Sequence, residues 1–173
     1  MNPSIFTEEN GVYQIDCSAA IWATDQISSL YHAEGTFLSD VDFAIETPDY
    51  LLLVEYKNAS ISGAVNPQAF QPSSAKRVDK IARKFYDSLH YLHMEEKCKP
   101  VKYVYIVEYP NAGTTDRKQL RNLIAARLPF KLQKGKKGRL IEDFEVLSIS
   151  EWNSHAKYGI FPLSPVAKHG TVK

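Results

Sequence analysis

The chain has 173 residues, of which 44% are hydrophobic and 24% charged. These values are typical of a globular domain of ordinary size and exclude a disordered or fibrous protein. Because 21 Lys and Arg residues balance 20 Asp and Glu residues, a nucleic-acid partner has to be held by a local basic patch and not by bulk charge. We expect a single domain over residues 1–173, with its core at about 18–150 and an irregular tail at 152–173.

Neither the cysteines nor the N-terminus indicates a special class of protein. Cys17 and Cys98 lie far apart and outside any CxxC spacing, so the sequence predicts neither a disulfide framework nor a structural zinc site. The N-terminus MNPSIFTEEN lacks a basic region followed by an apolar stretch. No window approaches the roughly 18 apolar residues of a membrane span. We therefore expect a cytoplasmic protein without a membrane partner.

The first part of the chain predicts a helix followed by a hairpin. Apolar residues recur with near-helical spacing over residues 18–33. Strands are expected at about 40–46 and 51–58, with a turn at Pro48-Asp49 between them. Because strand side chains alternate, one face of this hairpin is expected in the core. That face carries Val41, Phe43, Ile45, Leu52, Val54 and Tyr56.

The second part of the chain predicts alternating helices and strands. We expect a loop at 59–72, a helix from Ser73 or Ser74 to about Lys97, a strand at 101–109, a helix from about 115 to 128 and a strand at 144–149. This order indicates an α/β domain in which helices flank a central mixed β-sheet.

Two groups of basic residues are candidates for contacts with a nucleic acid. The long helix carries Lys76, Lys80 and Lys84 mainly on the side opposite its apolar stripe. The loop KLQKGKKGR adds Lys134, Lys136, Lys137 and Arg139. A flexible basic loop can follow a phosphate backbone. The alternative is an ordinary solvated surface, since exposed helix faces and turns use the same residue types.

The hairpin is the most informative stretch. If its strands pair about the turn, residue i lies opposite residue 97 − i, so Asp42 faces Glu55. Asp40 then faces Lys57. Directly opposed residues have Cβ atoms ~5 Å apart, and like charges in this relation are destabilising unless they are neutralised. A divalent cation neutralises two carboxylates. The pattern therefore predicts a metal-assisted reaction on a phosphate.

Asp42, twelve intervening residues and then Glu55-x-Lys57 resemble the pattern of the PD-(D/E)xK nuclease superfamily, also called the restriction-endonuclease-like fold. The resemblance covers about residues 18–109. It implies that Asp42 and Glu55 bind Mg²⁺ or Mn²⁺ and that the main-chain carbonyl of Tyr56 adds a third ligand. Lys57 would orient or activate the attacking water. The resemblance also implies a nuclease that hydrolyses phosphodiester bonds, with DNA favoured over RNA, and one that works as a homodimer in many members.

The chemistry of these residue types agrees with this resemblance. Phosphodiester hydrolysis needs a hydroxide near neutral pH and a positive charge near the transition state, and a hard cation held by carboxylate oxygens supplies both. An ammonium beside the cation stabilises developing charge or takes a proton from water.

The chain also departs from the family pattern. Ser39 or Val41, and not Pro, precedes the candidate aspartates, so Asp40 stays an alternative to Asp42 or a second metal ligand. The strand that precedes the aspartate strand in this family has only two candidates, residues 36–38 and 11–15. Some members add an acidic residue from the first helix, and Glu34 is placed to do so.

The ExK spelling alone is weak evidence. Glu95-Glu96-Lys97 and Asp116-Arg117-Lys118 match it too, but both fall on predicted helices, where the first and third residues point in different directions. Two alternatives to the enzyme remain. One is a surface hairpin with an ordinary ion pair between Asp40 and Lys57. The other is a catalytically inactive nuclease-like module that binds nucleic acid or protein.

Overall fold

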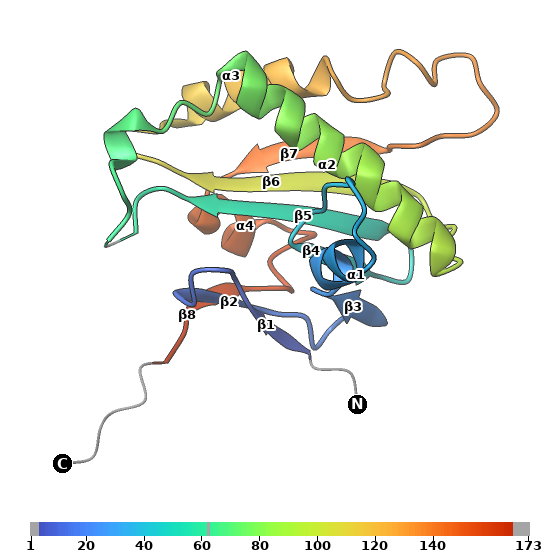
Figure 1. Ribbon diagram of the computed structural model, residues 1–173, viewed down its shortest axis with the longest axis horizontal. Helices are drawn as coiled ribbons and strands as arrows, with labels where there is room; N and C mark the ends of the chain where they lie inside the picture. Colours follow the sequence, from blue (N-terminus) through green and yellow to red (C-terminus); the bar gives the residue numbers. More distant parts are fainter. Residues whose placement is uncertain (1–3, 62, 168–173) are drawn as a thin grey trace.

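The computed structural model describes residues 4–61 and 63–167 and contains two β-sheets (Figure 1). The central mixed sheet has five strands in the order β3 (Trp22–Thr24), β4 (Phe43–Glu46), β5 (Leu51–Asn58), β6 (Val101–Glu108) and β7 (Asp143–Leu147). The small sheet has the order β1 (Ile5–Thr7), β2 (Tyr13–Asp16) and β8 (Leu163–Pro165). The helices are α1 (Ile27–Ala33), α2 (Ala75–Met94), α3 (Thr114–Ala125) and α4 (Ile149–Ser154). The expected α/β domain with a mixed sheet flanked by helices is confirmed.

Three layers build the domain. Figure 1 shows α2 and α3 on one face of the central sheet, with α4 and the small sheet on the other. One hydrophobic core lies on the side of α2 and includes Leu53, Phe85 and Tyr103. A second core lies on the side of α4 and includes Val54 and Trp152. Both faces of the sheet are therefore buried, which explains the continuous apolar run Leu51–Val54 at the start of β5.

The predicted register of the hairpin is confirmed. Phe43 lies opposite Val54, and Glu46 lies opposite Leu51. Beyond Val54, strand β5 has no partner strand on the side of β4 within the described residues. On its other side it pairs in parallel with β6 along its whole length. The part of the predicted hairpin that holds the aspartates is thus outside the β4–β5 ladder. Asp42 precedes the first residue of β4, although the sequence predicted it within the strand.

The predicted helix at 18–33 is wrong in its first half. Residues Trp22–Thr24 form the edge strand β3, which pairs antiparallel with β4, and helix α1 begins only at Ile27. The indole of Trp22 packs on Tyr91 of α2, with ring centroids 6.5 Å apart. This packing and the ladder to β4 outweigh the near-helical spacing. The strand before the aspartates is therefore β3, whereas residues 13–16 join the small sheet and 36–38 form no strand.

The predicted face of Val41 is also wrong. Val41 belongs to the core beside α2, whereas Phe43 and Ile45 belong to the core on the other side of the sheet. Strand alternation does not reach Val41, because β4 begins only at Phe43.

The C-terminal segment is more ordered than the sequence indicates. It contains the end of α4 and the strand β8, which pairs with β2. Trp152 is fully buried, and its indole N–H donates to the carbonyl of Phe161 at 2.7 Å. The described part of this segment is therefore a layer of the core. Within the described residues, no helix is both long and apolar enough to cross a membrane.

Replacing Trp152 tests the contribution of this layer. We expect Trp152→Ala to lower the free energy of unfolding by about 3–5 kcal/mol, because it leaves a cavity and an unpaired carbonyl. Urea unfolding followed by circular dichroism measures this loss. The control is Ile160→Ala in the same segment, where the side chain is 55% exposed and the change should stay within about 0.5 kcal/mol. Equal effects of the two changes would contradict the assignment of this segment to the core.

Candidate functional site

The structure brings the three predicted catalytic residues, Asp42, Glu55 and Lys57, into one pocket. This pocket has a volume of about 140 Å³ and lies beside the second half of β5 and the first half of α2. Strand β5 contributes Glu55, Tyr56 and Lys57, and Asp42 comes from the segment just before β4. The remaining lining residues are Glu9, Arg77, Lys80, Ile81, Lys84 and Tyr105.

Two of the lining residues form a buried ion pair. The ammonium nitrogen of Lys84 lies 2.7 Å from Oε1 and 2.8 Å from Oε2 of Glu55, so one lysine contacts both carboxylate oxygens. The two side chains are only 17% and 7% exposed. Lys84, which was predicted to contact nucleic acid, thus has a carboxylate of the site as its partner within the chain.

Asp42 is held against the backbone of β5. Its Oδ2 accepts a hydrogen bond of 2.7 Å from the backbone N–H of Tyr56. In a β-strand the N–H and the C=O of one residue point to the same side. The carbonyl of Tyr56 therefore also points toward Asp42, past the end of β4. Two carboxylates and one main-chain carbonyl are thus directed to one region.

Helix α2 also fixes the segment that carries the aspartates. The carboxylate of Asp87 accepts from the backbone N–H of Ser39 at 2.8 Å, and the hydroxyl of Ser88 accepts from the N–H of Val41 at 3.0 Å. Asp87 and Ser88 are themselves buried. These bonds replace the ladder that β4 would have supplied, and they set the position of Asp42 relative to β5.

Asp42 and Glu55 place two carboxylates beside the ammonium of Lys84 in a poorly solvated part of the pocket, whose whole lining has three acidic and four basic side chains. Burial raises the pKa of Glu55 to about 8, with a further increase from Asp42, while Lys84 acts in the opposite direction. Burial also raises the pKa of Asp42, against the effects of Lys84 and the Tyr56 N–H. Burial by itself lowers the pKa of Lys84, but Glu55 and Asp42 outweigh it, so this pKa is raised. The site therefore favours a cation or a proton.

The other predicted acidic ligands lie outside this pocket. Asp40 is half-buried and lines an adjoining cavity of about 410 Å³, together with Asp42 and Lys84. Burial raises the pKa of Asp40. Glu34 is exposed at the end of α1 and lines neither cavity. Glu9, which the sequence analysis missed, lines both. No sequence signal places it there, because only the packing of the small sheet brings it near.

The predicted basic residues separate into two regions. Lys80 and Lys84 line the pocket together with Arg77, which the sequence analysis missed, because residues spaced by three and four share one face of a helix. Lys76 is exposed beside them. The basic loop is elsewhere, since it joins the sheet where Glu142 bonds Val101 at the start of β6. Tyr105, which pairs with Glu55, follows four residues later, or roughly 13 Å along the strand. Figure 1 shows this loop at the end of the sheet opposite the arrowheads of β5 and β6.

The two other ExK matches have structural roles. Glu95 ends α2, and Lys97 contacts the carboxylate of Glu46 at 2.6 Å. Asp116 caps α3 by accepting from the N–H of Gly113 at 2.8 Å, and Arg117 pairs with Glu151. Neither triplet lines the pocket beside β5.

The donor set suits a hard divalent cation. Carboxylate and carbonyl oxygens are the ligands of Mg²⁺, which commonly takes one or two carboxylates and keeps several waters. Asp42, Glu55 and the Tyr56 carbonyl match this pattern. The described residues contain no group of three or more His, Cys, Asp or Glu side chains arranged to hold a metal ion. Water and substrate oxygens would therefore have to complete the coordination.

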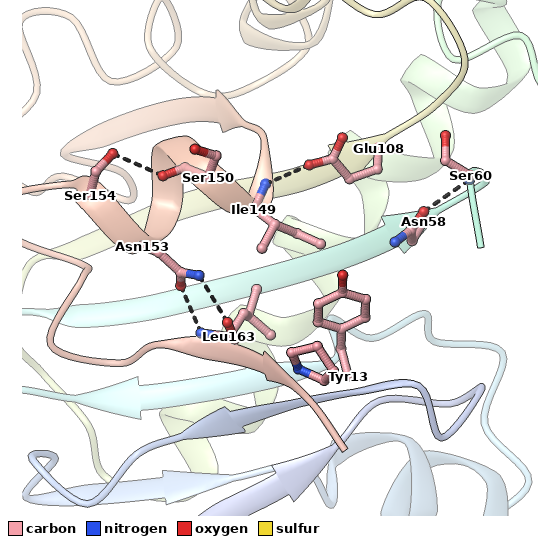
Figure 2. Close-up of a pocket in the computed structure, with 10 residues that line it drawn as sticks. Tyr13, Asn58, Ser60, Glu108, Ile149, Ser150, Asn153, Ser154 and Leu163 are labelled. Atoms are coloured by element: carbon pink, nitrogen blue, oxygen red, sulfur yellow. Dashed lines mark hydrogen bonds between the residues drawn. The ribbon is translucent and has the colours of Figure 1, made fainter. Parts of the chain in front are cut away.

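A larger cavity of about 790 Å³ lies on the other face of the sheet (Figure 2). It is bordered by α4, β8 and the ends of β5 and β6. Its charged lining residue is Glu108, whose carboxylate accepts from the N–H of Ile149 at 2.8 Å. No Lys or Arg among the described residues lines this cavity to offset the charge of a phosphate, whereas four basic side chains line the pocket beside α2. This cavity is therefore a weaker candidate for phosphate chemistry than the pocket beside α2.

Comparisons with protein-family models, with curated proteins and with solved structures gave no match to this chain. The functional argument therefore rests on the geometry of the pocket.

Replacing Lys84 tests whether Glu55 depends on its partner. Removing one member of a buried ion pair leaves an uncompensated charge, so we expect Lys84→Met to lower the free energy of unfolding by about 3–5 kcal/mol at alkaline pH. The folded-state pKa of Glu55, about 8, is above the ordinary value of 4.5. The folded state is then the stronger proton binder, and stability falls as pH rises through this window. Without Lys84 the pKa of Glu55 rises further, so the penalty should shrink as the pH decreases toward about 8, below which Glu55 is protonated in both proteins.

Urea unfolding at several pH values measures this penalty. Lys80→Met is the matched control, because Lys80 is an exposed lysine on the same helix, and its effect should stay within about 0.5 kcal/mol. A penalty that is the same at all pH values would contradict the dependence on Glu55.

Proposed function

We propose that this protein is a metal-dependent nuclease that hydrolyses phosphodiester bonds, with DNA favoured over RNA. The observation that supports the proposal most is the shared pocket of Asp42, Glu55, the Tyr56 carbonyl and Lys57. A hard cation held there would supply a hydroxide near neutral pH and offset the charge of the transition state. Phosphate chemistry also needs cationic side chains near the reacting group. Arg77 and Lys80 line the same pocket and meet this need.

Each residue has a distinct role in this proposal. Glu55 and Asp42 bind the cation, and the bond from the Tyr56 N–H keeps the Asp42 carboxylate turned toward β5. Lys57 is exposed at the mouth of the pocket, where it orients the attacking water or takes its proton. We favour Asp42 over Asp40 as the main ligand, because Asp42 lines the pocket with Glu55 and Asp40 lines the adjoining cavity.

The arrangement of the sheet supports a restriction-endonuclease-like fold as a further part of the proposal. An antiparallel pair β4–β5 carries the acidic residues, and β6 and β7 continue the sheet in parallel through helical connections. The helix after β5 then packs beside the site, as Lys84 and Ser88 show.

One observation favours an inactive nuclease-like binding module as the second candidate. Lys84 already neutralises both oxygens of Glu55, so the site is satisfied without a cation. Such a module would bind nucleic acid through its basic residues without cleaving it.

Cleavage assays separate the two candidates. We expect cleavage of single- or double-stranded DNA with Mg²⁺ or Mn²⁺, measured on labelled substrates, with RNA as the comparison substrate. Glu55→Gln removes a charged ligand of the cation, and Lys57→Ala removes the group that orients or deprotonates the water. Each change should lower kcat by about 10²–10⁴-fold. Asp42→Asn should cost more than Asp40→Asn. Lys157→Ala, an exposed lysine near α4, should not change the rate. Activity that persists in both Glu55→Gln and Lys57→Ala would contradict the assignment of the site.

Salt-dependent binding tests which basic region holds the nucleic acid. The slope of log K against log salt reports the number of neutralised phosphates, so each lysine or arginine that contacts one should reduce it by about one unit when it is replaced. We expect this reduction for Arg77→Ala and for Lys80→Ala, measured by fluorescence anisotropy in EDTA. Lys136→Ala and Lys137→Ala test the distant basic loop in the same way. An unchanged slope in both α2 variants would remove α2 from the binding surface.

A further inference from the structure

We propose that Lys84 is an internal counter-ion, which occupies the cation position of the metal-free site and is displaced when a divalent cation binds Glu55. The inference rests on the proposed function, because it assumes that a cation binds there. Its basis is the contact of one ammonium with both oxygens of Glu55, at 2.7 and 2.8 Å. Lys84 acts through Glu55 and is therefore a positioning residue.

The distances place a bound cation and the ammonium of Lys84 in competition for the same carboxylate. A magnesium ion lies about 2.1 Å from its oxygen ligands. Bound to a Glu55 oxygen, it would then be no more than about 5 Å from the ammonium of Lys84 in its present position. Two positive centres at that separation repel strongly in a poorly solvated pocket. We therefore infer that the ammonium moves away when the cation arrives.

The burial of Glu55 explains the position of Lys84. Glu55 is only 5% exposed, and Asp42 adds a second carboxylate beside it. A buried carboxylate without a partner is costly, so it needs a cation, a proton or an ion pair. Helix α2 supplies the ion pair, since Ile81 and Phe85 on either side of Lys84 are packed in the core and fix the helix against the sheet. The metal-free protein is thereby folded and neutralised before any metal binds.

The adjoining cavity can accommodate the displaced side chain of Lys84. Lys84 lines both the pocket beside β5 and the adjoining cavity of about 410 Å³, so its flexible stem can carry the ammonium away from Glu55. That cavity is also lined by Asp40, a carboxylate that can pair with the displaced ammonium.

Calorimetry with Mn²⁺ alone tests the competition. Because the cation no longer has to displace an ammonium, we expect Lys84→Met to bind Mn²⁺ about tenfold or more tightly than the wild type. Lys80→Met removes the same charge from the same pocket but not the contact with Glu55, so its gain should be much smaller. Lys84→Arg keeps a cationic partner for Glu55 and should not gain affinity. Equal or weaker binding by Lys84→Met would overturn the inference.

The same titrations distinguish failure of the inference from failure of the proposed function. Mn²⁺ binding to the wild type that is lost in Glu55→Gln supports the proposed site, whatever Lys84→Met shows. Absence of binding in the wild type and in Lys84→Met would overturn both proposals.

Chemical labelling of the wild-type protein gives a test that does not depend on the folding of a variant. Acetic anhydride acetylates accessible lysines, and mass spectrometry of peptides locates the modified residues. We expect saturating Mg²⁺ to increase acetylation of Lys84 and to leave that of Lys157 unchanged. Calorimetric binding of Mg²⁺ without any increase at Lys84 would contradict its displacement.

Discussion

The ion pair between Glu55 and Lys84 is the interaction on which the site depends. Strand β5 runs between two cores, and Glu55 sits where the apolar part of this strand ends. A carboxylate in that position is tolerated only because α2 places an ammonium across both of its oxygens. The pair therefore joins the central sheet to its longest helix, and it also defines the charge of the pocket.

Helix α2 contributes to the site in three ways. It contributes Lys84 to Glu55, it bonds the backbone of Ser39 and Val41 through Asp87 and Ser88, and it presents Arg77 and Lys80 to the open side. The aspartate segment needs these bonds because β4 ends before reaching it. A regular strand would have set Asp42 by its ladder. Here a short irregular segment is set by side chains of the helix, which lets Asp42 turn its carboxylate to the Tyr56 N–H.

The layer on the second face of the sheet supports this arrangement by its packing. Trp152, Tyr158 and Phe161 fill the core beneath β5 and β6, and the small sheet covers them. Because this layer buries the other side of β5, the strand is rigid where Glu55 and Lys57 project from it. The same layer brings Glu9 to the mouth of the pocket. The described part of the C-terminal segment, up to residue 167, lines no part of the pocket beside α2.

The sequence by itself determined the local features of this protein. The turn at Pro48-Asp49 and the apolar alternation around it predicted the hairpin register, and spacing by two placed Glu55 and Lys57 on one face. The stronger elements, α2 and β6, were predicted nearly to their ends. Predicted elements failed where contacts between distant segments overrode local pattern. Residues 22–24 became a strand because β4 offers a ladder and Tyr91 offers a stacking partner, although their spacing is near-helical.

Only the tertiary structure decided how the site is composed. Lys84 looked like one of several surface lysines, since a periodic pattern shows which helix face a residue occupies but not which side chain faces it. Its bond to Glu55 spans 29 positions of the chain. The entry of Glu9 and the separation of the basic loop from the pocket depend in the same way on packing between segments remote in sequence. Spacing along one element is fixed by backbone geometry, whereas the meeting of two elements is decided by the burial that their packing achieves.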